Sequence, residues 1–286
     1  MILSGSARIA GVMGWPISHS RSPRLHGFWL QQYKIDGAYL PLPVAPDYFR
    51  DALRLLPRIG FAGVNITVPH KEAALAAVDR IEPVAKRIGA VNTVIAAGDG
   101  TLTGTNTDGH GFMANLESTI AGFRASTGPA VVLGAGGAAR AVLVALLDAG
   151  APEIRLVNRS HDRAQHLARE LGGPIRPLHW DRRADGLADA ALLVNTTTLG
   201  MKGQPPLEIA LDRLPDTAVV NDIVYVPLET PLLAAARARG NRVVDGLGML
   251  IHQASVGFAA WFGVKPEASA ELRAFLVSDL MGPGQK

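Results

Sequence analysis

Residues 130–139 read AVVLGAGGAA, a short apolar run followed by a cluster of small residues. The run 130–133 is typical of a buried strand, and the glycines after it permit a sharp turn. Residues 137–149 have the apolar spacing of a helix, and 154–157 form a second apolar run. A strand, a glycine-rich turn, a helix and another strand in this order predict a βαβ unit with a parallel sheet.

The turn in this unit has the spacing GxGxxA, which binds dinucleotides when it joins a strand to a helix. Gly134 permits the tight turn, Gly136 lets backbone amides approach a pyrophosphate, and Ala139 is small enough for helix–strand packing. The helix N-terminus attracts the anion through its free N–H groups and its dipole. A purely structural glycine turn is the alternative, but the strand–turn–helix context favours the dinucleotide. The predicted contacts are Gly134, Ala135, Gly136, Gly137 and Ala138.

The end of the second strand indicates which dinucleotide binds. An NAD site usually has an acidic residue here, which binds the ribose hydroxyl. This chain has Asn158 and Arg159 instead, and Arg163 follows four residues later. A guanidinium binds a 2′-phosphate that a carboxylate would repel. The pattern therefore predicts NADP as the cofactor, the alternative being that these arginines are only solvated surface residues.

Composition limits the classes of function. The chain has 286 residues, 48% of them hydrophobic and 19% charged, which suits two packed domains and argues against disorder. It contains no cysteine, so disulfides, thiolate metal sites and cysteine nucleophiles are excluded. The net charge is +3 and the arginines are scattered, so we expect no nucleic-acid partner.

The N-terminal residues MILSGSAR lack the basic and apolar segments of a signal peptide. No apolar run approaches the roughly 18 residues that span a bilayer. We therefore expect a cytoplasmic protein with no membrane partner.

Strand-like and helix-like segments alternate through the rest of the chain, which predicts the α/β class. The expected strands elsewhere are 8–13, 39–44, 63–68, 90–97, 190–195, 218–224 and 242–245. The expected helices elsewhere are 23–33, 48–56, 69–77, 111–116, 161–171, 229–239, 250–262 and 266–280. The architecture is thus an N-terminal α/β domain followed by a doubly wound domain of Rossmann type.

Three segments of the first half carry polar residues that a plain core would not need. In residues 14–23, Ser20 and Ser22 can present hydroxyls to a carboxylate near a helix start, although Ser22 would also serve as a helix cap. In residues 65–71, Lys71 falls in the first turn of the expected helix 69–77, where the helix dipole disfavours a cation. In the third segment, Asp108 is a functional carboxylate or a helix cap.

Together these segments resemble the shikimate dehydrogenase family over nearly the whole chain. The first half carries PISHSRSP (16–23), NITVPHK (65–71), GAVNT (89–93) and NTDG (106–109). The second half carries GAGGAA (134–139), NRS (158–160), NDIVY (221–225) with Pro227, and DGLGML (245–250) with Gln253.

The resemblance implies a role for each matching residue. Lys71 and Asp108 would form the catalytic pair. The implied substrate contacts are Ser20 and Ser22 at the ring carboxylate, Thr67, Asn92 and Gln253 at the ring hydroxyls, and Tyr225 nearby. The implied cofactor contacts are Asn158, Arg159, Ser160 and Arg163 at the adenosine phosphate, and Gly246 and Met249 near the nicotinamide.

The family implies NADP-dependent reduction of 3-dehydroshikimate to shikimate, and the reverse, in aromatic amino-acid biosynthesis. Oxidising an alcohol requires removal of the hydroxyl proton as hydride leaves carbon, and Lys71 with Asp108 can handle that proton. No metal is needed. A quinate or dual quinate/shikimate dehydrogenase is the alternative, although Ser22 favours shikimate. A non-catalytic NADP-binding module is a remote alternative, with no reason to keep both Lys71 and Asp108.

The resemblance also implies how the chain divides. We expect residues 1–108 to form the substrate-binding and catalytic domain and 109–245 the NADP-binding Rossmann domain. Residues 246–286 would be helices that pack back on the substrate domain and bring Gln253 to the substrate. A homodimer is compatible with the sequence. Two departures from the family pattern, Gly27 after His26 and NTTTLGM at 195–201, involve no residue with an implied catalytic role.

Overall fold

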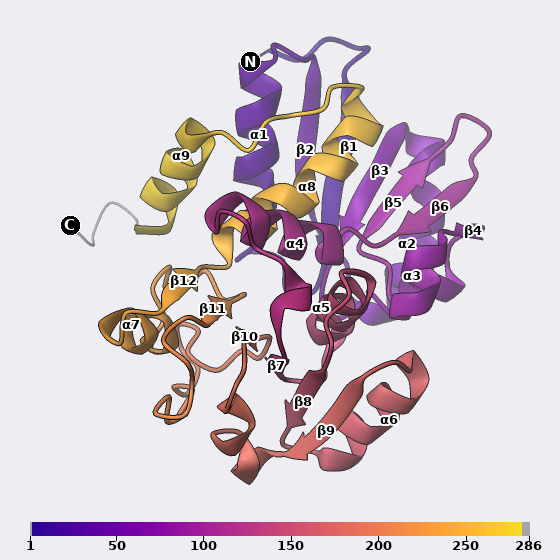
Figure 1. The fold of residues 1–286 in the computed structure, drawn as a ribbon. Helices are drawn as coiled ribbons and strands as arrows, with labels where there is room; N and C mark the ends of the chain where they lie inside the picture. The colour runs from indigo at the N-terminus through magenta and orange to yellow at the C-terminus, as the bar shows by residue number, and fades with distance from the viewer. Residues whose placement is uncertain (1, 282–286) are drawn as a thin grey trace. The chain divides into compact units, whose positions relative to one another are not determined.

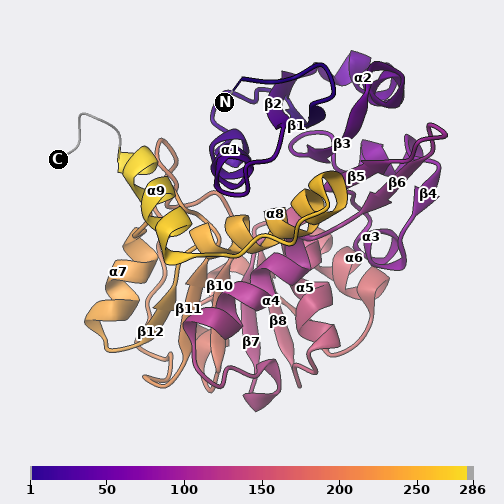
Figure 2. The ribbon, with the colours of Figure 1, turned by 90° about the horizontal axis from the view of Figure 1, so that it is seen from above.

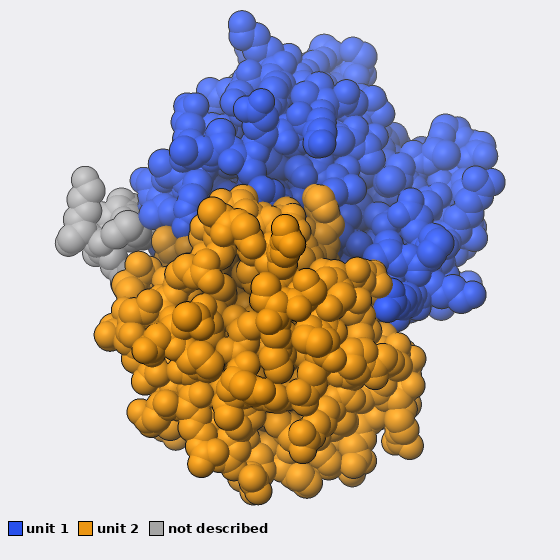
Figure 3. Space-filling view, viewed as in Figure 1, with its two compact units in different colours: residues 1–108, 250–286 blue, residues 109–249 orange. Residues whose placement is uncertain are grey.

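The computed structural model describes residues 2–281; residue 1 and residues 282–286, the end of the expected C-terminal segment, lie outside this range. The chain divides into two compact units (Figure 3). Unit 1 consists of residues 1–108 and 250–286, and unit 2 of residues 109–249. The divisions fall near the first residues of two helices, α4 (Asp108–Thr119) and α8 (Leu247–Phe262).

Within the described residues, unit 1 has a six-stranded sheet in the order β2-β1-β3-β5-β6-β4 (Figure 1). Its strands are β1 (Arg8–Gly14), β2 (Gly37–Pro43), β3 (Phe61–Ile66), β4 (Arg80–Ile81), β5 (Thr93–Ala96) and β6 (Leu102–Thr105). The strand β1 runs parallel to β2 and β3, whereas β5 runs antiparallel to β3 and β6. The strands β4 and β6 were not predicted, because β4 has two residues and β6 reads LTGT, without an apolar run.

The unit 1 helices contribute apolar faces to its core. They are α1 (Ser22–Gln32), α2 (Phe49–Leu55), α3 (Pro83–Ile88), α9 (Ala270–Met281) and the part of α8 from residue 250. Trp29 of α1 and Phe258 and Trp261 of α8 are fully buried. A side chain at Gly63 would overlap the Val94 carbonyl and the Trp261 indole, which donates a 3.1 Å hydrogen bond to that carbonyl. This packing places α8 against the middle of the sheet.

The helix expected over residues 69–77 is wrong. The chain turns after β3, with the His70 amide donating to the Thr67 carbonyl, and then forms a single 3₁₀ turn, Ala73–Ala76. Tertiary contacts of His70 override the helical pattern: its ring stacks on Phe49 at 4.4 Å and its Nε2 lies 2.7 Å from the Val44 carbonyl. Lys71 therefore does not lie in the first turn of an α-helix, and the dipole argument for it fails.

Unit 2 has, in its described residues, a six-stranded parallel sheet in the order β12-β11-β10-β7-β8-β9 (Figure 1). Its strands are β7 (Ala130–Leu133), β8 (Ile154–Asn158), β9 (Ile175–His179), β10 (Leu192–Asn195), β11 (Val219–Asp222) and β12 (Arg242–Val244). This is the Rossmann strand order, with the topological switch point between β7 and β10. The strand β9 was not predicted; it reads IRPLH and is not fully buried.

Helices cover the unit 2 sheet. They are α4, α5 (Gly137–Asp148), α6 (His161–Leu171) and α7 (Pro231–Ala238). The helix α6 packs on β8 and β9 and α7 packs on β11 and β12, toward opposite ends of the sheet (Figure 2). None of the helices within residues 2–281 is long and apolar enough to cross a membrane.

Candidate active site

Lys71 and Asp108 are brought into contact in unit 1. The Lys71 Nζ lies 2.6 Å from the Asp108 Oδ2, and the two side chains are 22% and 10% exposed. Lys71 comes from the turn after β3, and Asp108 is the first residue of α4, shortly after β6. A partly exposed ammonium held by a carboxylate can exchange a proton with a molecule bound beside it.

Asn92, just before β5, supports the pair. Its Nδ2 donates to the Asp108 Oδ1 at 2.8 Å and to the Thr107 Oγ1 at 3.0 Å, and its Oδ1 accepts the Thr107 amide at 2.9 Å. The Oε1 of Gln253, from α8, lies 3.4 Å from both the Asn92 Nδ2 and the Thr107 Oγ1. Lys71, Asp108, Asn92 and Gln253, predicted from four separate segments, therefore form one cluster.

The remaining unit 1 residues lie on neighbouring segments. Thr67 directly follows β3, its amide donates to the Met13 carbonyl, and its methyl group occupies the space where Gly14 lacks a side chain. Ser22 is the first residue of α1 and is buried, but the N-cap position belongs to Arg21 and no side chain caps the helix. The alternative that Ser22 is a helix cap is therefore wrong.

The two serines are connected to each other and to the core. The Ser20 Oγ accepts a hydrogen bond from the Ser22 amide at 3.3 Å. Burial raises the pKa of the Tyr39 phenol well above its usual value, and a hydrogen bond with the Ser22 side chain opposes this rise. Ser22 thus lies near the buried Tyr39 phenol.

The glycine-rich turn of unit 2 is shaped by backbone conformation. Gly134 has φ of +104°, and a side chain there would stand 2.8 Å from the Thr196 Oγ1, so only glycine fits. Side chains at Gly136 and Gly137 would meet open space. The helix α5 begins at Gly137 with no capping side chain and no acidic residue in its first turn. These features fit the pyrophosphate of a dinucleotide, because the first-turn amides remain available to an anion.

The end of β8 provides the predicted phosphate clamp. The Asn158 Nδ2 donates to the Ser160 carbonyl at 2.9 Å, and the Ser160 Oγ accepts the Arg163 amide at 3.4 Å as the N-cap of α6. Arg159 and Arg163 are exposed, and neither guanidinium has a carboxylate partner within residues 2–281. Two unpaired cations at this strand end fit a 2′-phosphate.

Three further predicted residues lie in unit 2. A side chain at Gly246 would overlap the carbonyls of Ile223 and Val224, so packing is by itself sufficient to require glycine at this position. Met249 is buried in the hydrophobic core, and Tyr225 lies half-buried in the loop after β11. Their contacts with cofactor or substrate stay predictions.

Asp222, at the end of β11, is a buried carboxylate for which the sequence predicted no role. It accepts hydrogen bonds from the Thr230 hydroxyl at 2.7 Å, the Val224 amide at 3.0 Å and the Asn195 Nδ2 at 3.0 Å. Burial raises its pKa to about 6, and the hydrogen bonds, led by that of Thr230, oppose the rise. Asp222 therefore anchors the loop that carries Tyr225; its place at a buried strand end was the signal available in the sequence.

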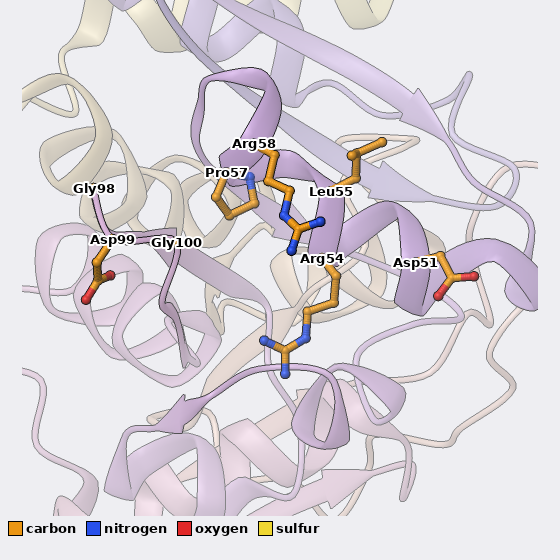
Figure 4. A pocket seen from close by; sticks show the side chains of 8 residues that line it. All are labelled: Asp51, Arg54, Leu55, Pro57, Arg58, Gly98, Asp99 and Gly100. Carbon is orange, nitrogen blue, oxygen red and sulfur yellow. The ribbon is translucent and has the colours of Figure 1, made fainter.

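A separate hollow of unit 1, about 530 Å³ in volume, is lined by α2, the residues after it and the turn 98–100 (Figure 4). Arg54 and Arg58 project into it, and Arg54 pairs with Asp79 at 2.5 Å. None of the residues predicted for the site lines this hollow. The chemistry of unit 1 is concentrated at the Lys71–Asp108 cluster instead.

Segments of both units match models of known protein families. The shikimate dehydrogenase substrate binding domain matches residues 12–94, and shikimate / quinate 5-dehydrogenase matches residues 116–200. A shikimate dehydrogenase (NADP(+)) of Paramagnetospirillum magneticum is 62% identical, over 96% of this chain and 100% of its own length.

Solved structures agree. Shikimate 5-dehydrogenase of Thermus thermophilus, in complex with NADP(H) and shikimate, is 39% identical with a TM-score of 0.84, over 94% of this chain and 98% of its own. Quinate dehydrogenase of Corynebacterium glutamicum, in complex with NAD, is 30% identical with a TM-score of 0.88, over 95% of this chain and 99% of its own. Fold alone therefore does not separate shikimate from quinate as substrate. The clustered motif residues and the 62% identity over nearly the whole length mean that this chain belongs to the shikimate dehydrogenase family.

Proposed function

We propose that this chain is an NADP-dependent shikimate dehydrogenase, which reduces 3-dehydroshikimate reversibly to shikimate in aromatic amino-acid biosynthesis in the cytoplasm. The observation that carries the proposal is the 2.6 Å contact between Lys71 and Asp108, with Asn92 and Gln253 beside it. Family membership supports it independently.

In this proposal the chain's own residues bind the ring and manage one proton. When bound, NADPH would supply the hydride for the reduction, and NADP⁺ would accept it in the oxidation, at nicotinamide C4. Lys71 donates a proton to the new alkoxide oxygen during reduction and accepts it during oxidation, while Asp108 holds the Lys71 Nζ in place. The hydroxyl groups of the ring are bound by Thr67, Asn92 and Gln253, and Tyr225 is proposed as a further substrate contact.

Cofactor binding uses the backbone of one segment and the side chains of another. The amides of residues 134–138 hold the pyrophosphate, and the segment 158–163 holds the 2′-phosphate through Asn158, Arg159, Ser160 and Arg163. Gly246 and Met249 border the nicotinamide.

The test is a panel assay of shikimate and quinate against NADP and NAD, followed at 340 nm. We expect shikimate with NADP to have the highest kcat/KM. A higher kcat/KM for quinate would establish the quinate alternative, and no turnover with any pair would leave a non-catalytic module.

The proposed carboxylate site is tested by Ser20→Ala and Ser22→Ala. Hydrogen bonds to a charged group contribute about 1.5–3 kcal/mol, so KM for shikimate should rise roughly tenfold or more. NADP affinity is the internal control and should stay unchanged. Unaltered KM values in both variants would remove these serines from the site.

A further inference from the structure

A chain of hydrogen bonds runs through the core of unit 1 and ends on Asp108. The Tyr39 hydroxyl donates to the Asn65 Oδ1 at 2.6 Å, and the Asn65 Nδ2 donates to the Thr93 Oγ1 at 3.0 Å. The Thr93 hydroxyl donates to the Asn92 Oδ1 at 2.9 Å, and the Asn92 Nδ2 donates to Asp108 at 2.8 Å. Thr93 is fully buried, and Tyr39, Asn65 and Asn92 are nearly so.

The backbone fixes the direction of every bond in this chain. The Asn92 Oδ1 accepts from the Thr107 amide, which can only donate, so the Asn92 NH₂ group must face Asp108. The Asn65 Nδ2 also donates to the Asn92 carbonyl, which can only accept, so the Asn65 amide has one orientation as well.

Thr93 joins these two amides. The Asn65 NH₂ group points at its oxygen, and the single Thr93 hydroxyl proton is directed to the Asn92 Oδ1 at 2.9 Å, which is nearer than the Thr107 Oγ1 at 3.5 Å. The Asn92 oxygen thereby accepts from Thr93 as well as from the amide and the hydroxyl of Thr107, and the Asn92 NH₂ group is held against the carboxylate that orients Lys71. Loss of the Thr93 hydroxyl would remove one of the contacts that position the Asn92 side chain, while the backbone pairing of β5 would be unaffected.

We infer that Thr93 is a positioning residue, which acts through Asn92 to hold Asp108 as a charged hydrogen-bond acceptor for Lys71. The inference rests on the proposed catalytic role of the Lys71–Asp108 pair. It assigns to a buried strand residue, with no exposure to solvent, an effect on the proton-transfer step.

The test compares Thr93→Val, which keeps the branched shape, with Thr93→Ser, which keeps the hydroxyl. Thr103→Val, on the neighbouring strand β6, is the matched control, since the Thr103 hydroxyl has no part in this chain of bonds. For each variant, kcat, KM for shikimate and the pH dependence of kcat are measured, with thermal unfolding as the check on folding.

We expect Thr93→Val to lower kcat roughly three- to tenfold, in line with the net contribution of one hydrogen bond. Its pH profile of kcat should also shift, because the carboxylate that orients Lys71 is then less firmly held. Thr93→Ser should restore both properties, and Thr103→Val should match the wild type.

Two results would overturn the inference. One is a Thr93→Val protein with kcat within twofold of wild type and an unmoved pH profile. The other is Thr93→Ser as impaired as Thr93→Val, which would assign the effect to methyl packing. A Lys71→Ala variant with normal turnover would instead overturn the proposed function, so the two failures are distinguishable.

Discussion

The two units form their sites from different chemical groups. In unit 1 the chemistry belongs to side chains, and Lys71, Asp108 and Asn92 are already bonded to one another. In unit 2 it belongs to backbone amides at the start of α5, while Arg159 remains exposed and unpaired in the described chain. Substitutions among the bonded side chains of unit 1 should therefore lower catalytic turnover. Substitutions in the glycine-rich turn of unit 2 should alter the backbone conformation and weaken cofactor binding.

The largest expected effect is in unit 1. Lys71→Ala should lower kcat by about 10²–10⁴, the usual contribution of a general acid–base group, with a smaller change in KM. Asp108→Asn should behave similarly, and the double variant should be far from additive, because the pair acts as a unit. Lys86→Ala, an exposed lysine of α3, is the control. Near-normal turnover of Lys71→Ala at saturating shikimate would contradict the assignment.

A smaller effect is expected at the exposed cation of unit 2. Arg159→Ala removes a charged partner of the 2′-phosphate, which costs about 1.5–3 kcal/mol, or one to two decades in NADP affinity. NAD lacks this phosphate, so its kcat/KM should scarcely change. The measurement is the ratio of kcat/KM for the two cofactors, with Arg169→Ala, an exposed arginine later in α6, as control. An unchanged ratio would mean that Arg159 is only a solvated surface residue and does not bind the 2′-phosphate.

Two substitutions in the glycine-rich turn distinguish its contribution to stability from its contribution to cofactor binding. Gly134→Ala forces alanine to φ of +104° and toward Thr196, so we expect unfolding free energy to fall by about 1–3 kcal/mol. Gly136 has φ of −92° and open space at its Cβ, so Gly136→Ala should keep stability within about 0.5 kcal/mol and weaken NADP binding. Urea unfolding and NADP titration measure these effects. Wild-type affinity in Gly136→Ala would argue against pyrophosphate at this turn.

One buried titratable group in each unit gives stability an opposite dependence on pH. His26 of α1 is fully buried and stacked on Tyr39 at 3.8 Å, and both ring nitrogens lack a hydrogen-bond partner in residues 2–281. Burial lowers its pKa from 6.5 to about 3, and the Asn65 side chain opposes this shift. The unfolded chain thus binds the proton first, and the contribution of His26 to stability is lost as pH falls from 6.5 toward 3.

Asp222 acts the other way, since its pKa rises from 3.8 to about 6 on folding. Its contribution is present below pH 3.8 and is lost as pH rises through about 6. Each group can contribute a slope of up to about 1.4 kcal/mol per pH unit. The unfolding free energy is measured with urea between pH 4 and 6. In His26→Phe the contribution that rises with pH should be absent, and in Asp222→Asn the contribution that falls with pH should be absent. Parallel curves for wild type and both variants would contradict these shifts.

Much of unit 2 could be predicted from contiguous sequence. The run AVVLGAGGAA contains the strand, the turn and the helix start that make the anion site, because positive φ at Gly134 and free amides at α5 are local properties. The strand end at Asn158 and Arg159 was readable for the same reason. The strand β9 was missed because IRPLH has no apolar periodicity.

The site residues of unit 1 were predicted one by one through family resemblance, including the Lys71–Asp108 pair, but the hydrogen bonds that connect them were not. Physical reasoning placed Lys71 in a helix that does not form, since contacts of His70 with Phe49 and Val44 determine that turn. No role was predicted for three polar residues of the motifs, Asn65, Thr93 and Thr107. Their hydrogen bonds join residues up to 28 positions apart, which local spacing does not show.

The sequence by itself therefore determined the fold class, the family and the dinucleotide turn, whose properties depend on residues that are neighbours in the chain. Only the tertiary structure decided which way the Asn92 and Asn65 amides face, that Ser22 is buried without capping α1, and that Asp222 anchors a loop. The physical reason is that a buried polar group must find its partner wherever the fold brings one within about 3 Å, and that distance is not encoded by local spacing.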